Sequence, residues 1–587
     1  MSEDCRMAGA RLGEMAELME LKGENPFKVR AYQNAARLLE SADLDLKALA
    51  LEDRLTEIKG VGQGLADKIK EFLTTGNIAD HEALKLEFPA GVVEMLKVPG
   101  LGAKKVKLLH DALAINNVGE LEYACTENRL LTLKGFGEKS QKKILDGIAL
   151  FRRHAGRSLL SHALEAALPL LEAIRRNKVV YQAELAGSLR RRRETVGDID
   201  ILVSTDEAPR VMEFVTRLAD VESVIGSGET KTSIRLKSGM QVDVRAVKPI
   251  EFPFALHYFT GSKEHNVAIR SRAQAQGLKL NEYGLTRSAD GTPLRCLSEA
   301  DIFKVLGLDD IPPELREDTG EIEAALNHSL PKLVSADAIR GSIHNHTDWS
   351  DGIATLEEMV AAAKRIGWSY LGISDHSQAA GYANGLKPDR VVAQHALIDQ
   401  VNAMRPGLRV LKGSEVDILL SGEVDFDAET RGQFDYLVES VHSRFNLSVE
   451  EMTARVLKAI EDPQVMVLGH PSGRLLQARD PYPLDYERVF AACAREGVAI
   501  ELNANPHRLD LDWRHIRHAR DLGVKFFINA DAHSAPGLDD VALYGIGLAR
   551  KGWLEATDIV NTRDLQGVLA FFSERRSRAA KLRPGRA

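Results

Sequence analysis

Residues 185–204 read LAGSLRRRRETVGDIDILVS, and this stretch determines how the region around it folds. A Gly187-Ser188 turn follows an apolar run, and a run of arginines comes next. Asp198 and Asp200 then begin a second apolar run. Side chains at i and i+2 of a strand share a face, so both carboxylates point the same way and can hold divalent cations. The stretch predicts a phosphate-binding turn beside a metal site.

A third carboxylate comes from the strand patterns that surround this stretch. From about residue 178 the chain alternates or runs apolar over strand lengths, which predicts an α+β domain. Asp243 lies in one such strand, MQVDVRAV, and completes the cluster. Three converging carboxylates suit a pair of Mg²⁺ or Mn²⁺ ions in nucleotidyl transfer. The other interpretation makes Asp198 and Asp200 exposed strand-end residues that bind no metal.

The order G-S-x-R-R followed by G-D-I-D resembles the signature of the polymerase beta nucleotidyltransferase superfamily. The later segment ALHYFTGSKEHNVAIRSRA resembles the nucleotide-selecting subdomain of family X DNA polymerases, and the resemblance extends over residues 1 to 318. It implies template-directed addition of dNTPs, with Asp198, Asp200 and Asp243 as catalytic metal ligands. It also implies nucleotide or template contacts by Gly187, Ser188, Arg191, Gly197, Tyr258, Phe259, Gly261, Lys263, Asn266 and Arg270.

The resemblance leaves one alternative open and shows one departure from the family pattern. By the resemblance, Tyr258 and Phe259 screen the deoxyribose, whereas without it they would be assigned to the core. Asn266 would meet the incoming base or the minor groove, and Arg270 the template strand. Lys263 stands where the polymerase beta pattern is acidic, so we expect a different base contact there.

A short repeat near the N-terminus joins an apolar residue, Gly-x-Gly and a lysine-bearing helical pattern. Its copies are IKGVGQGLADKIKEFL, VPGLGAKKVKLL and LKGFGEKSQKKIL. Glycine lets a phosphate approach the backbone N–H groups of a helix N-terminus, so the repeats predict DNA binding that does not read sequence. The alternative is that the glycines only cap helices. The predicted contacts are Gly60, Gly62, Gly100, Gly102, Gly135 and Gly137.

The first copy, together with NPFKVRAYQNAARLLE before it, resembles the small N-terminal domain of DNA polymerase beta. The resemblance implies that Lys68 is a Schiff-base lysine for 5′-deoxyribose phosphate lyase chemistry and that Lys28 and Tyr32 bind the 5′ phosphate. Such chemistry needs a neutral amine, so the pKa of Lys68 would have to fall from about 10.4. Alternatively, Lys68 is a solvated lysine that contacts a phosphate, and Gly64 replaces a lysine that the family often carries.

Beyond residue 339, apolar runs repeatedly end in His, Asp, Glu or Asn, and helical patterns separate several of them. This β/α alternation predicts a barrel whose strand ends carry the chemistry. The polar set provides nitrogen and oxygen ligands for two or three Zn²⁺, Mn²⁺ or Fe ions. The predicted ligands are His344, His346, Asp351, His376, Glu415, His442, His470, Asp531 and His533.

This ordered ligand set resembles the PHP domain, a distorted seven-stranded (β/α)7 barrel with a trinuclear metal site. The resemblance implies hydrolysis of phosphodiesters or phosphomonoesters. In bacterial relatives with this arrangement it implies 3′–5′ exonuclease activity, 3′-phosphate removal and abasic-site cleavage. Arg474 and His507 are further candidates to contact a phosphate.

Composition leaves these functions open. The formal net charge is −8, but basic residues are locally clustered, and bound cations would neutralise many of the acids. The 4 cysteines form no C-x-x-C pair, which argues against a disulfide framework or a thiolate zinc site. No apolar run reaches the roughly 18 residues of a membrane span. We expect a soluble, cytoplasmic, monomeric protein.

The sequence therefore predicts a multidomain DNA repair polymerase for short gaps that also processes DNA ends. Its partners would be gapped or primer-template DNA and dNTPs. One alternative is a phosphoesterase whose N-terminal half only binds DNA, and another is a scaffold for other repair proteins. The predicted segments are helix-hairpin-helix regions at 1–85 and 86–155, a palm at 156–250, a thumb-like subdomain at 251–318, a linker at 319–338, the PHP domain at 339–575 and a basic tail at 576–587.

Overall fold

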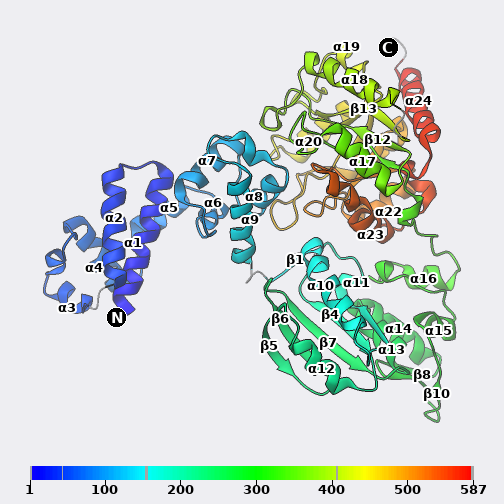
Figure 1. The fold of residues 1–587 in the computed structure, drawn as a ribbon, viewed down its shortest axis with the longest axis horizontal. Helices are drawn as coiled ribbons and strands as arrows, with labels where there is room; N and C mark the ends of the chain where they lie inside the picture. The colour runs from blue at the N-terminus through cyan, green and yellow to red at the C-terminus, as the bar shows by residue number, and fades with distance from the viewer. Residues whose placement is uncertain (1–2, 42–43, 153–155, 405–406, 584–587) are drawn as a thin grey trace. The chain divides into compact units, whose positions relative to one another are not determined.

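The computed structural model describes residues 3–41, 44–152, 156–404 and 407–583. The chain divides into two compact units, Met1–Arg152 and Arg153–Ala587, called here the N-terminal unit and the C-terminal unit (Figure 1). Within the described ranges, no helix combines the length and the apolar composition needed to cross a membrane.

The regular structure described in the N-terminal unit is helical. It contains two hydrophobic cores, one around Leu12, Met15 and Ile69 and the other around Val92 and Leu109. Its α-helices are α1 (Glu3–Lys22), α2 (Pro26–Ser41), α3 (Leu46–Leu51), α4 (Gln63–Thr75), α5 (Ala79–Leu86), α6 (Ala90–Met95), α7 (Ala103–Leu113), α8 (Val118–Thr126) and α9 (Glu138–Arg152).

The glycine repeats share one backbone geometry. The first glycine of each copy has a positive φ: 90° at Gly60, 84° at Gly100 and 95° at Gly135. L side chains rarely adopt such angles, which explains the glycine. The second glycine precedes the next helix, so that α4, α7 and α9 each begin directly after it. The predicted order of helix, tight glycine turn and helix is confirmed.

The C-terminal unit begins with a mixed five-stranded sheet, in the order β2-β4-β7-β6-β5, in which only β4 and β7 are parallel. Its strands are β2 (Gln182–Leu185), β4 (Ile199–Ser204), β5 (Val221–Ser227), β6 (Lys231–Leu236) and β7 (Gln241–Val247). Burial alternates along β7, so Val242 and Val244 enter the core while Asp243 lies on the opposite face. This is the expected α+β palm.

Short elements complete the palm. The strand pair β1 (Ser158–Leu159) and β3 (Thr195–Val196) and the helices α10 (Leu160–Arg175), α11 (Gly187–Arg190) and α12 (Ala208–Thr216) accompany the sheet.

A small subdomain follows, with its own core around Phe254, Ile269 and Phe303. Its elements are α13 (Phe252–Thr260), α14 (Lys263–Ala275), β8 (Leu278–Asn281), β9 (Gly284–Arg287), β10 (Pro293–Leu294), α15 (Glu299–Val305) and α16 (Glu321–Leu326).

The rest of the C-terminal unit is a seven-stranded parallel barrel whose strands follow chain order. A parallel bridge between Asn345 and Ala532 joins the segments that follow its first and last strands. The predicted barrel is confirmed (Figure 1). Its strands are β11 (Gly341–Ser342), β12 (Tyr370–Ile373), β13 (Arg409–Asp417), β14 (Tyr436–Ser440), β15 (Val465–Leu468), β16 (Ala499–Asn503) and β17 (Phe526–Asn529).

Helices occupy the connections between these strands and follow the last of them. They are α17 (Leu356–Ile366), α18 (Pro388–Ala403), α19 (Ala428–Arg431), α20 (Val449–Ile460), α21 (Tyr486–Glu496), α22 (Trp513–Asp521) and α23 (Ile546–Lys551).

The C-terminal end differs from the basic tail expected at 576–587. Helix α24 (Leu565–Leu582) continues through most of that segment, and residues 584–587 lie outside the described residues. Phe572 stacks on Tyr436 inside the barrel, with 5.5 Å between ring centroids. Arg575 donates hydrogen bonds to the carbonyls of Ile460 and Asp462, at 2.8 and 2.9 Å. Packing and side-chain hydrogen bonds thus order a segment whose composition suggested a frayed end.

Candidate active sites

The first candidate site lies where the α11 turn meets β4 and β7. Gly187 has a φ of 59°, and a Cβ at this position would lie 2.3 Å from Oδ2 of Asp200. Asp200 is the register partner of Asp243 across the parallel β4–β7 pair. Asp198 is exposed and immediately precedes β4, so the strand begins just after the first predicted carboxylate. A glycine turn and two strands therefore bring these groups together.

The charges at this site favour a bound cation. Burial and the nearby carboxylates of Asp198 and Asp243 raise the pKa of Asp200 to about 6. Burial also acts to raise the pKa of Asp243, but hydrogen bonds from Lys231, Ser233 and Gln241 outweigh it and lower that pKa. A buried carboxylate whose pKa is raised by neighbouring carboxylates, as at Asp200, is stabilised as an anion by divalent cations, so these residues fit a metal site.

Lys231 is a part of this site that the sequence did not single out. Its Nζ lies 2.6 Å from Oδ2 of Asp243, and the two residues lie on the neighbouring strands β6 and β7. The lysine thus supplies a positive charge to a carboxylate that is predicted to bind metal. Its only sequence signal was its place in the strand pattern KTSIRL.

The predicted nucleotide-selecting turn lies at the end of α13. Tyr258 and Phe259 are both half-buried, with 5.1 Å between their ring centroids, so the structure does not place them fully in the core. The Asn266 amide donates to the Tyr258 carbonyl at 2.7 Å, and Nε of Arg270 donates to the Asn266 carbonyl at 3.2 Å. Lys263, the first residue of α14, is exposed.

Arg191 joins the palm turn to this second turn. Its guanidinium donates to the Thr260 carbonyl, and a Cβ at Gly261 would lie 3.0 Å from Nη1. Its Nε also donates to Glu317 at 3.1 Å. Two predicted contacts remain. Ser188 is half-buried in α11, and Gly197 is exposed and directly precedes Asp198.

The residues predicted for lyase chemistry lie in the N-terminal unit. Nζ of Lys68 is 2.9 Å from Asp80 and 3.3 Å from Glu71, and these partners raise its pKa. Lyase chemistry needs the opposite shift. Lys28 is 3.5 Å from Glu24, and Tyr32 is half-buried with its pKa raised by burial.

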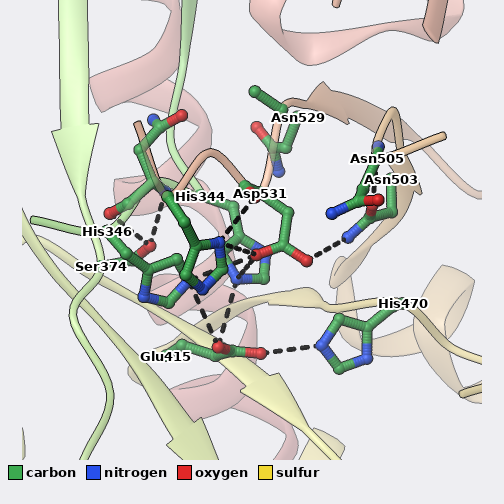
Figure 2. A network of polar contacts seen from close by, with 12 residues as sticks. His344, His346, Ser374, Glu415, His470, Asn503, Asn505, Asn529 and Asp531 are labelled. Atoms are coloured by element: carbon green, nitrogen blue, oxygen red, sulfur yellow. Dashed lines mark hydrogen bonds and ion pairs between the residues drawn. The ribbon is translucent and has the colours of Figure 1, made fainter. Parts of the chain in front are cut away.

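The second candidate site lies at the carboxyl ends of the barrel strands, where the predicted imidazoles and carboxylates converge (Figure 2). Ligand atoms within each of three groups lie within 4.8 Å of one another. The groups are His346, Asp351, His376 and His533; His344, His346 and Asp531; and His376, Glu415 and His442. The ninth predicted residue, His470, joins them through Glu415.

Glu415 contacts five histidines of this cluster, and Figure 2 shows it below His344 and His346 and beside His470. Its Oε2 is near ring nitrogens of three histidines, and its Oε1 is near two more. The Oε2 distances are 3.3 Å to His344, 3.5 Å to His346 and 3.0 Å to His376, and the Oε1 distances are 3.2 Å to His442 and 2.8 Å to His470. A carboxylate in this position is suited to bridging metal ions.

The side chains of this cluster are almost completely buried, and their charges are complementary. Burial acts to lower the pKa of His344, but Glu501, Glu415 and Asp531 raise it well above its usual value. Burial would raise the pKa of Glu415, yet the surrounding histidines hold it well below its usual value. Buried imidazoles and carboxylates whose nitrogen and oxygen atoms lie this close together fit a metal centre.

Two carboxylates that the sequence did not single out orient the histidines. Glu501 lies 2.7 Å from Nδ1 of His344, and Asp417 lies 2.7 Å from Nδ1 of His442. Each leaves the Nε2 of its histidine directed at Glu415. Asp417 carried a signal, because it stands two residues after Glu415 in the strand pattern and so faces the same side.

The contacts of Arg474 and His507 are with protein groups, and a phosphate contact by either residue stays a prediction. Arg474 bonds to the carboxylate of Asp512 and to the carbonyls of Arg508 and Leu509. It also approaches Glu194 of the palm at 3.9 Å. The His507 ring centroid lies 6.4 Å from that of His162 in α10. These contacts give both residues a place between the palm and the barrel.

Four family models match separate parts of the chain, and one relative matches nearly all of it. A DNA polymerase beta thumb model matches residues 255–317, and a PHP domain model matches 342–505. A helix-hairpin-helix domain model matches 10–78, and a SAM-like helix-hairpin-helix tandem model matches 92–149. The chain is also 38% identical over 562 residues to a protein named DNA polymerase/3′-5′ exonuclease PolX from Bacillus subtilis, covering 95% of this chain and 98% of the relative.

This chain belongs to the bacterial family X DNA polymerases that carry a PHP domain. This family X polymerase has partial relatives as well. It is 29% identical over 157 residues to a probable phosphatase from Syntrophotalea carbinolica and 29% identical over 153 residues to one from Caldicellulosiruptor saccharolyticus. The matches cover 26% and 25% of this chain and 59% of each relative.

Proposed function

We propose that this family X polymerase fills short gaps in DNA by template-directed addition of dNTPs and that its PHP domain trims the 3′ ends of the same DNA. It would act as a monomer in the cytoplasm. The supporting observation is that one chain carries two separate sets of ligands. The palm brings Asp200 and Asp243 together beside the Gly187 turn, and the barrel gathers imidazoles around Glu415.

In the palm, Asp198, Asp200 and Asp243 would hold Mg²⁺ or Mn²⁺, which would supply activation of the primer 3′ hydroxyl and stabilisation of the triphosphate. The backbone of the Gly187 turn and the Ser188 hydroxyl bind phosphate oxygens, and Arg191 supplies positive charge. Tyr258 and Phe259 are available to meet the sugar because they are only half-buried.

Base and template contacts come from α14. Lys263 and Arg270 are exposed on this helix and can reach DNA without any change in the core. The Asn266 amide nitrogen donates to the Tyr258 carbonyl, and its Oδ1 accepts no hydrogen bond among the described residues, so this oxygen can meet a donor on an incoming base while the Tyr258 hydrogen bond holds the side chain in place.

In the PHP domain, the nine clustered residues would hold two or three Zn²⁺, Mn²⁺ or Fe ions, which would supply hydrolytic chemistry at phosphorus. Glu501 and Asp417 fix the ring orientation of two ligands, as carboxylates beside metal-bound histidines do. The resulting activities are 3′–5′ removal of nucleotides and of 3′ phosphates, and we retain abasic-site cleavage as a prediction from the resemblance.

The N-terminal unit would hold the DNA. Its three glycine turns each place backbone N–H groups at the start of a helix, which favours phosphate. Lys68 serves better as a phosphate contact than as a Schiff-base lysine, because Asp80 and Glu71 keep its amine charged.

Substitution at each site separately tests the proposal. Asp200→Ala is expected to abolish primer extension on a gapped duplex and to leave 3′–5′ hydrolysis within about twofold of wild type, and His344→Ala is expected to do the reverse. Both activities are measured with Mg²⁺ and with Mn²⁺, and Asp206→Ala serves as a control on the palm. Loss of both activities in either variant, with an unchanged circular dichroism spectrum, would refute separate sites. A wild-type protein that hydrolyses DNA but never extends a primer would favour the phosphoesterase alternative.

A further inference from the structure

A lysine of the PHP domain is buried against the polymerase turn. Lys551 ends α23 and is 1% exposed. Its Nζ donates to Oε1 of Glu317 at 2.6 Å and to the carbonyl oxygen of Arg191 at 3.1 Å. The ammonium group also lies 4.7 Å from the ring centroid of Trp513. One barrel side chain thus contacts both the run of arginines and the end of the thumb segment.

Glu317 is shared among three cations. Besides Lys551, it accepts from Nε of Arg191 at 3.1 Å and from Nη1 of Arg193 at 3.4 Å, and its own side chain is 7% exposed. Burial would raise the pKa of Glu317, but Lys551, Arg191 and Arg193 lower it, so the group is a carboxylate. The Lys551 amine has its pKa lowered to about 8 by burial, which Glu317 opposes, and it is mostly charged at neutral pH.

The interaction of Arg191 with Glu317 competes with its proposed interaction with a triphosphate. In this structure its guanidinium holds Glu317 and the Thr260 carbonyl. A bound triphosphate would compete with Glu317 and with the Thr260 carbonyl for this guanidinium. A buried carboxylate that loses its partner is strongly destabilised unless other cations remain beside it.

We propose that Lys551 is a positioning residue of the polymerase site, which keeps Glu317 neutralised while Arg191 turns to the triphosphate of the incoming nucleotide. The PHP domain thereby sets the nucleotide affinity of a site that it does not itself form. The inference rests on the proposed function, in which Arg191 is a triphosphate ligand.

Steady-state kinetics of gap filling test this role. In Lys551→Met, only Arg191 and Arg193 remain on Glu317, so Arg191 is held more firmly and the KM for dNTP is expected to rise about fivefold to tenfold. The kcat is expected to stay within about twofold, because the interaction affects binding of the nucleotide. Hydrolysis of single-stranded DNA by the PHP domain is expected to be unchanged, which also reports that the barrel is folded.

The same substitution in a Glu317→Gln background shows whether Lys551 acts through this carboxylate. Glu317→Gln removes the competing charge, so its KM is expected to equal or fall below that of wild type. In that background Lys551→Met is expected to change KM by less than about twofold. An equal rise in KM in both backgrounds, or an unchanged KM in Lys551→Met, would overturn the proposal. So would a severalfold rise in KM in Glu317→Gln alone, and this variant remains informative if Lys551→Met does not fold.

Two further variants separate the possible causes. Lys525→Met is a control, because the carboxylate near Lys525, Asp558, belongs to the PHP domain itself and not to the polymerase half. This variant is expected to leave the KM for dNTP unchanged. Arg191→Met tests the underlying assignment. If its KM for dNTP equals that of wild type, Arg191 is not a triphosphate ligand and the proposed function is wrong at that residue. If its KM rises while that of Lys551→Met does not, only the role of Lys551 is wrong.

Discussion

Glu501 lies on β16, and its carboxylate is shared among several groups of the metal cluster. Oε1 accepts from Asn529 at 3.0 Å and lies 2.7 Å from Nδ1 of His344, while Oε2 accepts from the backbone N–H of His470 at 2.7 Å. A carboxylate on the far nitrogen of a ligating histidine fixes the ring and makes its other nitrogen a stronger ligand. Glu501 therefore orients two predicted metal ligands, His344 and His470, and is not itself one of the nine predicted ligands.

Glu501→Gln removes this charge while keeping the shape of the side chain. We expect about tenfold to hundredfold weaker binding of Mn²⁺ by the PHP domain, because His344 loses the partner that orients its ring. Isothermal titration of the metal-free protein measures this affinity directly. Glu487→Gln, which alters a surface glutamate beside His518, is the control. Equal Mn²⁺ affinity in Glu501→Gln and wild type would show that the carboxylate has no such role.

The residue types that could be predicted share one property. The nine expected ligands stand at or just beyond the ends of apolar runs, where a polar residue interrupts the pattern. Glu501 instead lies inside the run VAIELNAN, and neither the spacing of the apolar residues nor the composition of this run marks it as a functional residue. Lys231 and Lys551 are similar cases, since their partners come from other strands or from a distant part of the chain. Such pairings become visible only in three dimensions.

At the scale of elements, α24 closes the amino-terminal end of the barrel. Phe571 and Phe572 belong to the core inside the barrel, together with Tyr436 and Phe527. The arginines of the helix bond to backbone carbonyls that precede the strands, as Arg576 does to Asp435 before β14. The helix thus combines an apolar face with a set of charged hydrogen-bond donors.

Phe572→Ala is expected to destabilise the PHP domain by about 3 to 5 kcal/mol, because a side chain that is 1% exposed would leave a cavity. Thermal unfolding followed by circular dichroism would show a lower midpoint, with the PHP activity lost at a lower temperature. Leu582→Ala, on the same helix but 44% exposed, provides a matched control. A midpoint within the error of wild type for Phe572→Ala would mean that α24 is not a structural part of the barrel.

Elements with a strong period or a turn signal were predictable from the sequence. The glycine hairpins, the palm strands and the alternation of the barrel each follow from short-range patterns. Helix α24 was not predicted, because its last residues are basic and show no apolar period. What orders Arg575 and Arg583 is a set of carbonyl groups more than 100 residues away in the chain, at Ile460 and Glu461.

At the scale of the molecule, the hairpin turns proposed to bind DNA and the residues proposed to bind metal lie in different units. The glycine hairpins lie in the N-terminal unit, whose cores are built from its own residues. Both metal-ligand sets lie in the C-terminal unit. Phosphate contacts contribute most to affinity without reading sequence, so we expect the two properties to be separable.

A fragment of residues 153–587 is expected to keep both activities at saturating DNA and to bind gapped duplex more weakly. Each phosphate contact contributes about 0.9 to the slope of log affinity against log salt, so the loss of three hairpin contacts should flatten that slope by about 3. Fluorescence anisotropy of labelled gapped DNA at several NaCl concentrations measures the slope. An unchanged slope in the fragment would place the phosphate contacts elsewhere.

The contacts of Lys551 with Glu317 of the thumb and of Arg474 with Glu194 of the palm limit how this chain can be recombined. A chimera that takes its polymerase half from one relative and its hydrolytic half from another would leave charges unmatched wherever these side chains differ. The polymerase half and the PHP half are therefore not independent of each other. Substitutions on one side of the contact between them are expected to be accompanied by compensating substitutions on the other side. An engineered protein in which either half is exchanged has to keep the paired residues on both sides of this contact.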